Sequence, residues 1–326
     1  MLERLYRLFY REPTIASKDI NVRYHSRFGG LWTDRLDANE VLRQKISKGI
    51  LSEELARHIS FFIDNGYVIL KQAVSHADID SYLAQFRIAT KGGSPLRASI
   101  PDAGPHDKGI VPLDQADIDL PLTKVLDTYQ YLPAAHALIF ADATRDFLHA
   151  VFEDDILAFQ GLHFEKGSTQ AIHQDTTYVV LNEPMKLCAS WVALEDVQAG
   201  SGELVYYPGS HRLPDWVYGG HHKHFNHKRD RHSEHLDHLN SLHAKSLERG
   251  LQLESFLPRK GDVLIWSADL AHGGAPISNA KLTRRSLVTH YTPKSVFPHY
   301  LRYKSPFTRN SKKSVAGCDY ISLYYK

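Results

Sequence analysis

The feature of this sequence that most constrains its fold is a change of pattern near residue 156. From that point, short apolar and β-branched segments alternate with turns that contain glycine and proline. The segments are residues 156–164, 170–180, 187–194, 203–207, 262–266 and 283–292. Short strands punctuated in this way are typical of an antiparallel sandwich or jelly roll. The sequence therefore predicts a mainly β core.

The residues before this core favour helices, with one short strand among them. Ser52 precedes two glutamates in the first turn of a helical repeat that ends at Gly66. A serine cap, an acidic first turn and a terminal glycine together predict a helix between them. The apolar residues 67–70 then predict a short strand, and residues 75–86 predict a second helix.

Three other segments of this half are less regular. Residues 88–122 are rich in glycine, proline and aspartate, which predicts a long ordered loop that borders a substrate site. Residues 122–152 are expected to be mostly helical, with a break at Leu132-Pro133. Residues 1–11 have leucines on one helical face and arginines elsewhere, which predicts a short helix packed on the domain, with a membrane-surface helix as the alternative.

We therefore predict a single domain over residues 1–326. Its expected parts are a mostly helical segment with an entry strand and an active-site loop (1–155), a β core (156–292) with a histidine-rich insertion (215–255), and a C-terminal extension (293–326).

Composition narrows the class of protein. A formal charge of +2 and the lack of a long basic block argue against nucleic-acid binding. Two cysteines are too few for a disulfide scaffold or a cysteine-based zinc site. No run of 18 apolar residues predicts a membrane span, and the N-terminus lacks a signal-peptide core, so a cytoplasmic protein is expected. The sequence makes no prediction of oligomeric state.

The first candidate site residues are in the motif His173-Gln174-Asp175. In an extended segment, side chains at i and i+2 point the same way, so His173 and Asp175 would face one point. Two histidines and one carboxylate on one face form the ligand set of oxygen-activating non-haem Fe(II). An isolated motif of this kind is more often a histidine hydrogen-bonded to a nearby aspartate, so further residues are needed.

Two later segments supply those residues. His272 follows a strand that begins after Lys260-Gly261-Asp262, and it lies 99 positions after His173. A jelly roll brings such distant strands side by side, so His272 could complete the ligand set. Arg284 begins a β-branched strand twelve positions further on. A guanidinium inside a barrel needs an anionic partner, which implies an acidic cosubstrate.

Together these segments resemble the phytanoyl-CoA dioxygenase family of Fe(II)/2-oxoglutarate oxygenases. The matching features are His173-x-Asp175, Trp191, G-S-G-E-L-V-Y-Y-P-G-S-H at 200–211, His272-Gly273, Arg284 and the spacing from Arg284 to His290. The resemblance covers residues 156–292 well. It implies a double-stranded β-helix, also called a jelly-roll or cupin-like fold, with N-terminal helices packed on one sheet.

The resemblance also implies roles for particular residues. In the family, the positions of His173, Asp175 and His272 bind iron and are catalytic, and the position of Arg284 holds the distal carboxylate of 2-oxoglutarate. The position of Trp191 lines the cosubstrate pocket, and Gln160 is aligned as a further contact of the cosubstrate. One departure is Gly274, because some members carry serine there to assist the arginine. Tyr207 or Thr289 could replace that serine, or Arg284 could suffice.

The implied reaction is a hydroxylation. Fe(II), 2-oxoglutarate and O₂ would convert an unactivated C–H bond of a small or medium-sized metabolite, with succinate and CO₂ released and ascorbate a candidate stimulant. The carboxylate of Asp175 argues against a halogenase, which has a small residue there. Desaturation, cyclisation or a non-catalytic metal- or ligand-binding module on the same fold are the alternatives.

The segment 221–243 contains eight histidines. His232, His235 and His238 recur at helical spacing and could form a second metal site. Leu236, Leu239 and Leu242 share that spacing, so we favour a solvated helical insertion that packs through its leucines and is a candidate lid.

The remaining histidines and tryptophans of interest, with their neighbours, have simpler expected roles. His290 either touches the pocket or only packs, and a structural role is preferred for Ser210 and His211 in their Pro-Gly turn. His163 and Lys166 are expected to be surface charges near the entrance. Trp216 and Trp266 are expected to be core residues.

Overall fold

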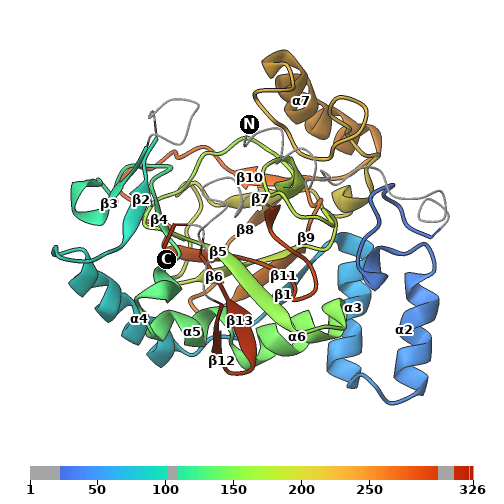
Figure 1. The fold of residues 1–326 in the computed structure, drawn as a ribbon, viewed down its shortest axis with the longest axis horizontal. Helices are drawn as coiled ribbons and strands as arrows, with labels where there is room; N and C mark the ends of the chain where they lie inside the picture. The colour runs from blue at the N-terminus through green and yellow to red at the C-terminus, as the bar shows by residue number, and fades with distance from the viewer. Residues whose placement is uncertain (1–22, 102–108, 300–311, 323, 326) are drawn as a thin grey trace, which may run out of the picture.

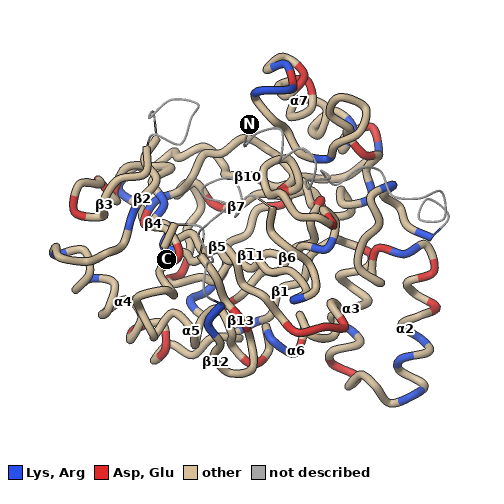
Figure 2. Tube along the Cα trace, in the orientation of Figure 1, with Lys and Arg blue, Asp and Glu red and all other residues tan. Residues whose placement is uncertain are grey.

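The computed structural model describes residues 23–101, 109–299, 312–322, 324 and 325, and Figure 1 shows its fold. The helix expected at residues 1–11 lies outside these residues. No helix in the described part of the chain is long and apolar enough to cross a membrane. Acidic and basic residues are interspersed along the trace, as Figure 2 shows.

The described helices cluster before the core, with one exception inside it. They are α2 (Ala38–Ser47), α3 (Glu53–Asn65), α4 (His76–Ala89), α5 (Ala134–Ile139), α6 (Asp142–Phe152) and α7 (His232–Glu248). The single-turn 3-10 helices are η1 (Trp32–Asp34), η2 (Leu113–Gln115), η3 (Thr128–Gln130), η4 (Asp175–Thr177) and η5 (Ser210–Arg212).

The described strands form one large and one small sheet. They are β1 (Tyr67–Leu70), β2 (Arg97–Ser99), β3 (Ile110–Pro112), β4 (Lys124–Leu126), β5 (Ile156–Phe164), β6 (Cys188–Ala193), β7 (Leu204–Tyr206), β8 (Glu254–Phe256), β9 (Val263–Ser267), β10 (His272–Gly274), β11 (Ser286–Pro293), β12 (Lys313–Val315) and β13 (Cys318–Tyr320). The large sheet has the order β1-β9-β6-β11-β5-β4-β2-β3, with β13 beside β5 and β12 beside β13. The small sheet has the order β10-β7-β8.

The two faces of the large sheet pack against different partners. On β9, Val263 and Ile265 belong to a core shared with the N-terminal helices, where Phe62 of α3 meets Phe147 of α6 edge-to-face. The alternate residues Leu264 and Trp266 belong to a second core shared with the small sheet. Because successive side chains of a strand point to opposite faces, the burial of both faces accounts for the apolar run of residues 263–266 in β9. The predicted double-stranded β-helix with helices packed on one sheet is confirmed.

Local signals set the ends of α3 as predicted. The hydroxyl of Ser52 accepts a hydrogen bond from the backbone N–H of Leu55, and Gly66 ends the helix in the left-handed conformation with φ of 78°. The second predicted helix is also confirmed, since α4 begins after a Ser75 cap.

Three predicted elements are wrong. Residues 170–180 contain no strand, since His173 forms only an isolated bridge and η4 follows it. Residues 88–122 contain strands β2 and β3, and residues 122–133 contain β4 and η3 where helix was expected. These three-residue strands are held by pairing with each other and with β5, so a local sequence pattern carries little information about them.

The histidine-rich insertion lies between β7 and β8 and contains α7, which projects from the sheets in Figure 1. The expected helix is confirmed, but its predicted packed face is wrong in part, because only Leu242 of the three leucines predicted there is buried. His235, His238 and Leu242 are buried, whereas Leu236 is 46% exposed. Polar partners explain this orientation, because the Tyr218 hydroxyl lies 2.8 Å from Nδ1 of His238 and 3.2 Å from Nδ1 of His235.

Candidate metal centre

The two histidines of the predicted site are neighbours across a backbone bridge. The N–H of His173 donates to the carbonyl of His272 at 2.9 Å, and the N–H of His272 donates to the carbonyl of His173 at 3.0 Å. Directly opposed residues of an antiparallel pair hold their side chains close together. This pairing brings together residues that are far apart in the sequence.

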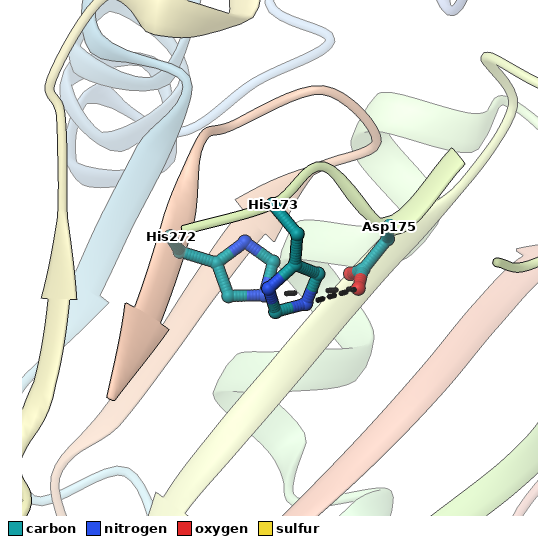
Figure 3. Close-up of side chains that lie close together, drawn as sticks. All are labelled: His173, Asp175 and His272. Carbon is teal, nitrogen blue, oxygen red and sulfur yellow. Dashed lines mark ion pairs between the residues drawn. The ribbon is translucent and has the colours of Figure 1, made fainter. Parts of the chain in front are cut away.

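Asp175 joins them through the local conformation of its segment. Gln174 is extended, with φ of −109° and ψ of 138°, so His173 and Asp175 project to the same side before η4 begins. Oδ1 of Asp175 lies 3.7 Å from Nε2 of both histidines. The ligand atoms of these three buried residues lie within 4.8 Å of one another, and Figure 3 shows the side chains pointing toward one another.

Second hydrogen bonds orient both imidazoles. Nδ1 of His173 lies 2.8 Å from the carbonyl of Ala171, and Nδ1 of His272 lies 2.8 Å from the carbonyl of Leu270. A carbonyl can only accept, so Nδ1 carries the proton and Nε2 offers its lone pair to the site. Burial and the nearby His272 lower the pKa of His173 to about 3, which keeps it a neutral ligand at pH 7.

The carboxyl group of Asp175 is ionised, and its second oxygen, Oδ2, has its own hydrogen-bond donor. Burial acts to raise the pKa of this carboxyl, but the imidazoles of His272, His290 and His173 outweigh burial and hold the pKa well below its usual range. Oδ2 accepts a hydrogen bond of 2.8 Å from the indole N–H of Trp266. Nε2 of His290 lies 3.4 Å from the same oxygen.

These ligand atoms face a cavity of about 760 Å³. All six predicted site residues line it, namely His173, Asp175, His272, Arg284, Trp191 and Gln160. The other lining residues are mostly apolar or uncharged polar, and include Ser99, Leu126, Leu162, Phe164, Ser168, Gln170, Tyr178, Val179, Leu204, Trp266, Val288, His290 and Tyr324. The 88–122 segment, which was expected to border a substrate site, contributes Ser99 to the lining of this cavity.

Arg284 brings an almost fully buried cation to this cavity. Its guanidinium carbon lies 5.4 Å from the ring of Phe164 and 5.7 Å from that of Trp191. Burial lowers its pKa to about 10 while Glu203 acts to raise it, so the side chain stays charged at pH 7. Nη1 donates to the carbonyl of Gly202 at 2.9 Å, but Nε has no partner. A buried donor without a partner is costly, which fits an anionic ligand at this place.

Sequence reasoning missed a second cation, Lys124 on β4. It lines the cavity with its ammonium group 5.9 Å from the ring of Phe164, the same ring that Arg284 covers. Burial lowers its pKa while the carboxylate of Asp175 acts to raise it. No motif marks this lysine, because its place follows from the pairing of β4 with β5.

The surroundings of Gly274, where some family members carry serine, are crowded. A Cβ at position 274 would lie 2.8 Å from Oγ of Ser168 and 2.7 Å from the N atom of Thr169, so the neighbouring segment fills the space of a side chain. Ser168 lines the cavity, whereas neither Tyr207 nor Thr289 belongs to its lining.

Two residues that sequence reasoning set aside, Trp266 and His163, have other surroundings than expected. Trp266 lines the cavity instead of serving only as core. His163 is fully buried between the Tyr82 hydroxyl and Glu165, at 3.0 Å from each, so it is not a surface charge. The ammonium of Lys166 donates to the carbonyls of Ala280 and Leu282.

The insertion offers no second metal cluster within the described ranges, where His173, Asp175 and His272 form the only group of suitable ligand atoms. The insertion reaches the cavity through Tyr178, whose hydroxyl lies 3.3 Å from Nε2 of His235. Burial, aided by the Asp175 carboxylate, raises the pKa of Tyr178 to about 12.

A double-stranded β-helix with two histidines, a carboxylate and a buried arginine around one cavity defines the class of non-haem Fe(II)- and 2-oxoglutarate-dependent dioxygenases. The chain belongs to the phytanoyl-CoA dioxygenase (PhyH) family, whose sequence pattern matches residues 62–286. Its cofactors are therefore Fe(II) and 2-oxoglutarate, and the arrangement above fits both.

Curated relatives agree with this assignment. The human "Phytanoyl-CoA dioxygenase, peroxisomal" is 22% identical over 272 residues, which cover 79% of this chain and 73% of the human protein. The bovine protein of the same name is 24% identical over 161 residues, 47% of each chain.

Solved structures resemble the fold at low identity. The carbocyclase SnoK from nogalamycin biosynthesis superposes with a TM-score of 0.56 at 18% identity, over 76% of this chain and 86% of SnoK. The epimerase SnoN of the same biosynthesis superposes with a TM-score of 0.55 at 16% identity, over 82% of this chain and 98% of SnoN. At this level of identity the likeness concerns the fold alone.

Proposed function

We propose that this protein hydroxylates an unactivated C–H bond of a small or medium-sized metabolite. The overall change would be R–H + O₂ + 2-oxoglutarate → R–OH + succinate + CO₂, in which one oxygen atom enters the product and the other enters succinate. The observation that carries the proposal is the convergence of three buried ligand atoms and two cations on one cavity.

His173, Asp175 and His272 would hold the iron on one side and leave its other positions open to the cavity. When bound, Fe(II) and 2-oxoglutarate supply the oxidative decarboxylation that makes dioxygen reactive toward a C–H bond. The protein's own part is to keep His173 neutral, to keep Asp175 ionised, and to surround the reacting groups with apolar side chains that exclude water.

The cosubstrate would lie between the iron and the two cations. Arg284 would bind the distal carboxylate of 2-oxoglutarate, and Lys124 would add a second positive charge near the same end, because both flank Phe164. Trp191 would form the wall and Gln160 would offer its amide. A dianion suits these two cations, because Asp175 is the only carboxylate that the described residues contribute to the cavity lining.

A cavity of about 760 Å³ lies within the range of small-molecule sites and leaves room for a metabolite beside the cosubstrate. Desaturation and cyclisation remain the alternative outcomes of the same chemistry. The intact ligand set argues against a non-catalytic module.

We also propose that residues 1–326 act as one catalytic domain, because β1 and β13, which lie on either side of the core in the sequence, belong to the same sheet as the core.

The proposal is tested by anaerobic titration of metal-free protein with Fe(II) and 2-oxoglutarate. A chelated 2-oxo acid on Fe(II) gives a weak visible charge-transfer band. We expect this band in the native protein and in Arg285→Ala, and its loss at the same ligand concentrations in Arg284→Ala. Arg285 is the matched control because it is outside the cavity lining and makes ion pairs with Glu165 and Glu195.

A band of equal strength in both variants would contradict the assignment of Arg284. No band in native protein that nevertheless binds iron would contradict the cosubstrate site and favour the binding-module alternative. Succinate release during incubation with candidate metabolites, followed by mass analysis of the product, then separates hydroxylation (a gain of one oxygen) from desaturation or cyclisation (a loss of two hydrogens).

A further inference from the structure

We infer that Trp266 and His290 are positioning residues that hold Asp175 so that only its Oδ1 atom can bind the metal. This inference rests on the proposed metal site. It gives Trp266 and His290, which are not themselves ligands, the role of orienting the carboxylate of Asp175.

The two oxygen atoms of Asp175 have different surroundings. Oδ1 is the oxygen that lies 3.7 Å from Nε2 of both histidines. Oδ2 points the other way, where the Trp266 indole N–H donates to it at 2.8 Å and Nε2 of His290 lies 3.4 Å away. A carboxylate oxygen with a hydrogen-bond donor on it is a poorer second ligand, so the carboxylate binds through one oxygen.

The supports come from two strands of the large sheet. Trp266 is on β9 and pairs with Ala189 of β6, while His290 is on β11 and also pairs with Ala189. The two side chains therefore reach Asp175 from either side of the same β6 residue. Asp175 itself is in η4, outside the sheet. Its carboxylate is therefore held by side chains of the sheet and not by its own backbone segment.

His290 is a buried imidazole that faces both the cavity and Asp175. It is 4% exposed and lines the cavity, its Nδ1 has no hydrogen-bond partner among the described residues, and the carboxylate oxygen that its Nε2 faces is Oδ2 of Asp175, at 3.4 Å. The ring of Phe159 lies 6.1 Å from it and leaves Nε2 facing Oδ2 of Asp175. A buried imidazole nitrogen without a hydrogen-bond partner is costly unless the loaded site uses it.

Two single variants test the inference. Trp266→Phe removes the N–H and keeps most of the aromatic ring, and His290→Leu removes the imidazole. The measurement is the dissociation constant of Co(II) for metal-free protein, by competition with a coloured chelator, without reliance on turnover. We expect each variant to weaken Co(II) binding by about 10-fold or more. Trp216→Phe is the matched control, because that indole stacks on His238 outside the cavity.

A double variant separates positioning from damage to the fold. In Asp175→Asn, the Trp266 N–H would select the amide oxygen and turn the NH₂ group, which cannot bind a metal, toward the histidines. Loss of Co(II) binding is therefore expected. In Trp266→Phe/Asp175→Asn the amide is free to turn its oxygen to the metal, so Co(II) binding should recover relative to Asp175→Asn alone. Damage to packing could not produce recovery.

Two results would overturn the inference. One is an unchanged Co(II) dissociation constant in both Trp266→Phe and His290→Leu, and the other is equal Co(II) binding by Asp175→Asn and the double variant. Failure of the underlying site would look different, because Asp175→Ala would then bind Co(II) as tightly as the native protein.

Discussion

Arg284 and Arg285 are identical neighbours with opposite surroundings. Arg284 is 2% exposed and faces the cavity, whereas Arg285 makes ion pairs with Glu165 at 2.7 Å and Glu195 at 3.0 Å. Both residues directly precede β11, where the N–H of Arg284 donates to the carbonyl of Glu165 and the carbonyl of Arg285 accepts from the N–H of Leu194, so the two side chains meet different partners. The resemblance pointed to Arg284, which lines the cavity, whereas the pattern of charged residues alone could not have chosen between the two.

At the same scale, Gly66 is required by both conformation and space. Its φ of 78° is left-handed, and a Cβ added there would lie 2.4 Å from Nδ1 of His211. We expect Gly66→Ala to lower the free energy of unfolding by about 2–4 kcal/mol, from backbone strain and overpacking together. Denaturant unfolding of the purified protein measures this loss.

Gly49→Ala is the control for the strain alone, because φ is 66° there but nothing lies within 4 Å of the added Cβ. It should cost about 1–2 kcal/mol. Equal losses in the two variants would mean that the His211 ring moves aside without cost.

At the scale of elements, α7 shows how tertiary contacts override a helical pattern. Leucine spacing predicted the packed face, but the histidines are inside because Tyr178, Tyr218 and Phe225 supply polar and aromatic partners for them. Most strands of the core were predicted from their local sequence pattern. Strand β4 was not, so Lys124, which lies on it, was not predicted as a residue of the cavity.

Buried histidines should make the insertion sensitive to acid. Burial, with Lys223 and other nearby cations, lowers the pKa of His238 to about 3, and burial with Arg229 lowers the pKa of His224 to about 4. Unfolded histidines take up a proton below about pH 6.5, whereas these two do not until the pH is near their folded values. The unfolded state therefore binds more protons, and the free energy of unfolding falls as the pH falls through this range.

The expected loss from each histidine is up to about 1.4 kcal/mol per pH unit below pH 6.5. Urea unfolding at pH 7.0, 6.0 and 5.0 measures it. His238→Gln should flatten the profile, while His232→Gln, at an exposed position of the same helix, should leave it unchanged. An unaltered profile in His238→Gln would show that this histidine takes no part.

At the scale of the whole molecule, the site ties distant parts of the chain together. His173 and Asp175 precede β6, and His272 begins β10 of the small sheet after the insertion has returned to the core. A metal that binds the folded site and not the unfolded chain stabilises all of these contacts at once.

We therefore expect Co(II) at one hundred times its dissociation constant to stabilise the protein by about 2.7 kcal/mol, a rise in Tm of roughly 5 °C. Differential scanning fluorimetry with and without a chelator measures the shift. Asp175→Ala should show no such rise. A shift of the same size in that variant would point to metal binding elsewhere on the surface.

The sequence by itself determined the order of the core strands along the chain, the capped helices α3 and α4, and the residues that line the cavity as candidate ligands. It could do so because caps, strand alternation and motif spacing act over a few residues. Only the tertiary structure decided that the H-x-D segment is a bridge and not a strand, that Lys124 is a second cation of the cavity, and that Trp266 and His290 hold Asp175. Each depends on pairing between segments distant in the chain, and no local pattern records which segments those are.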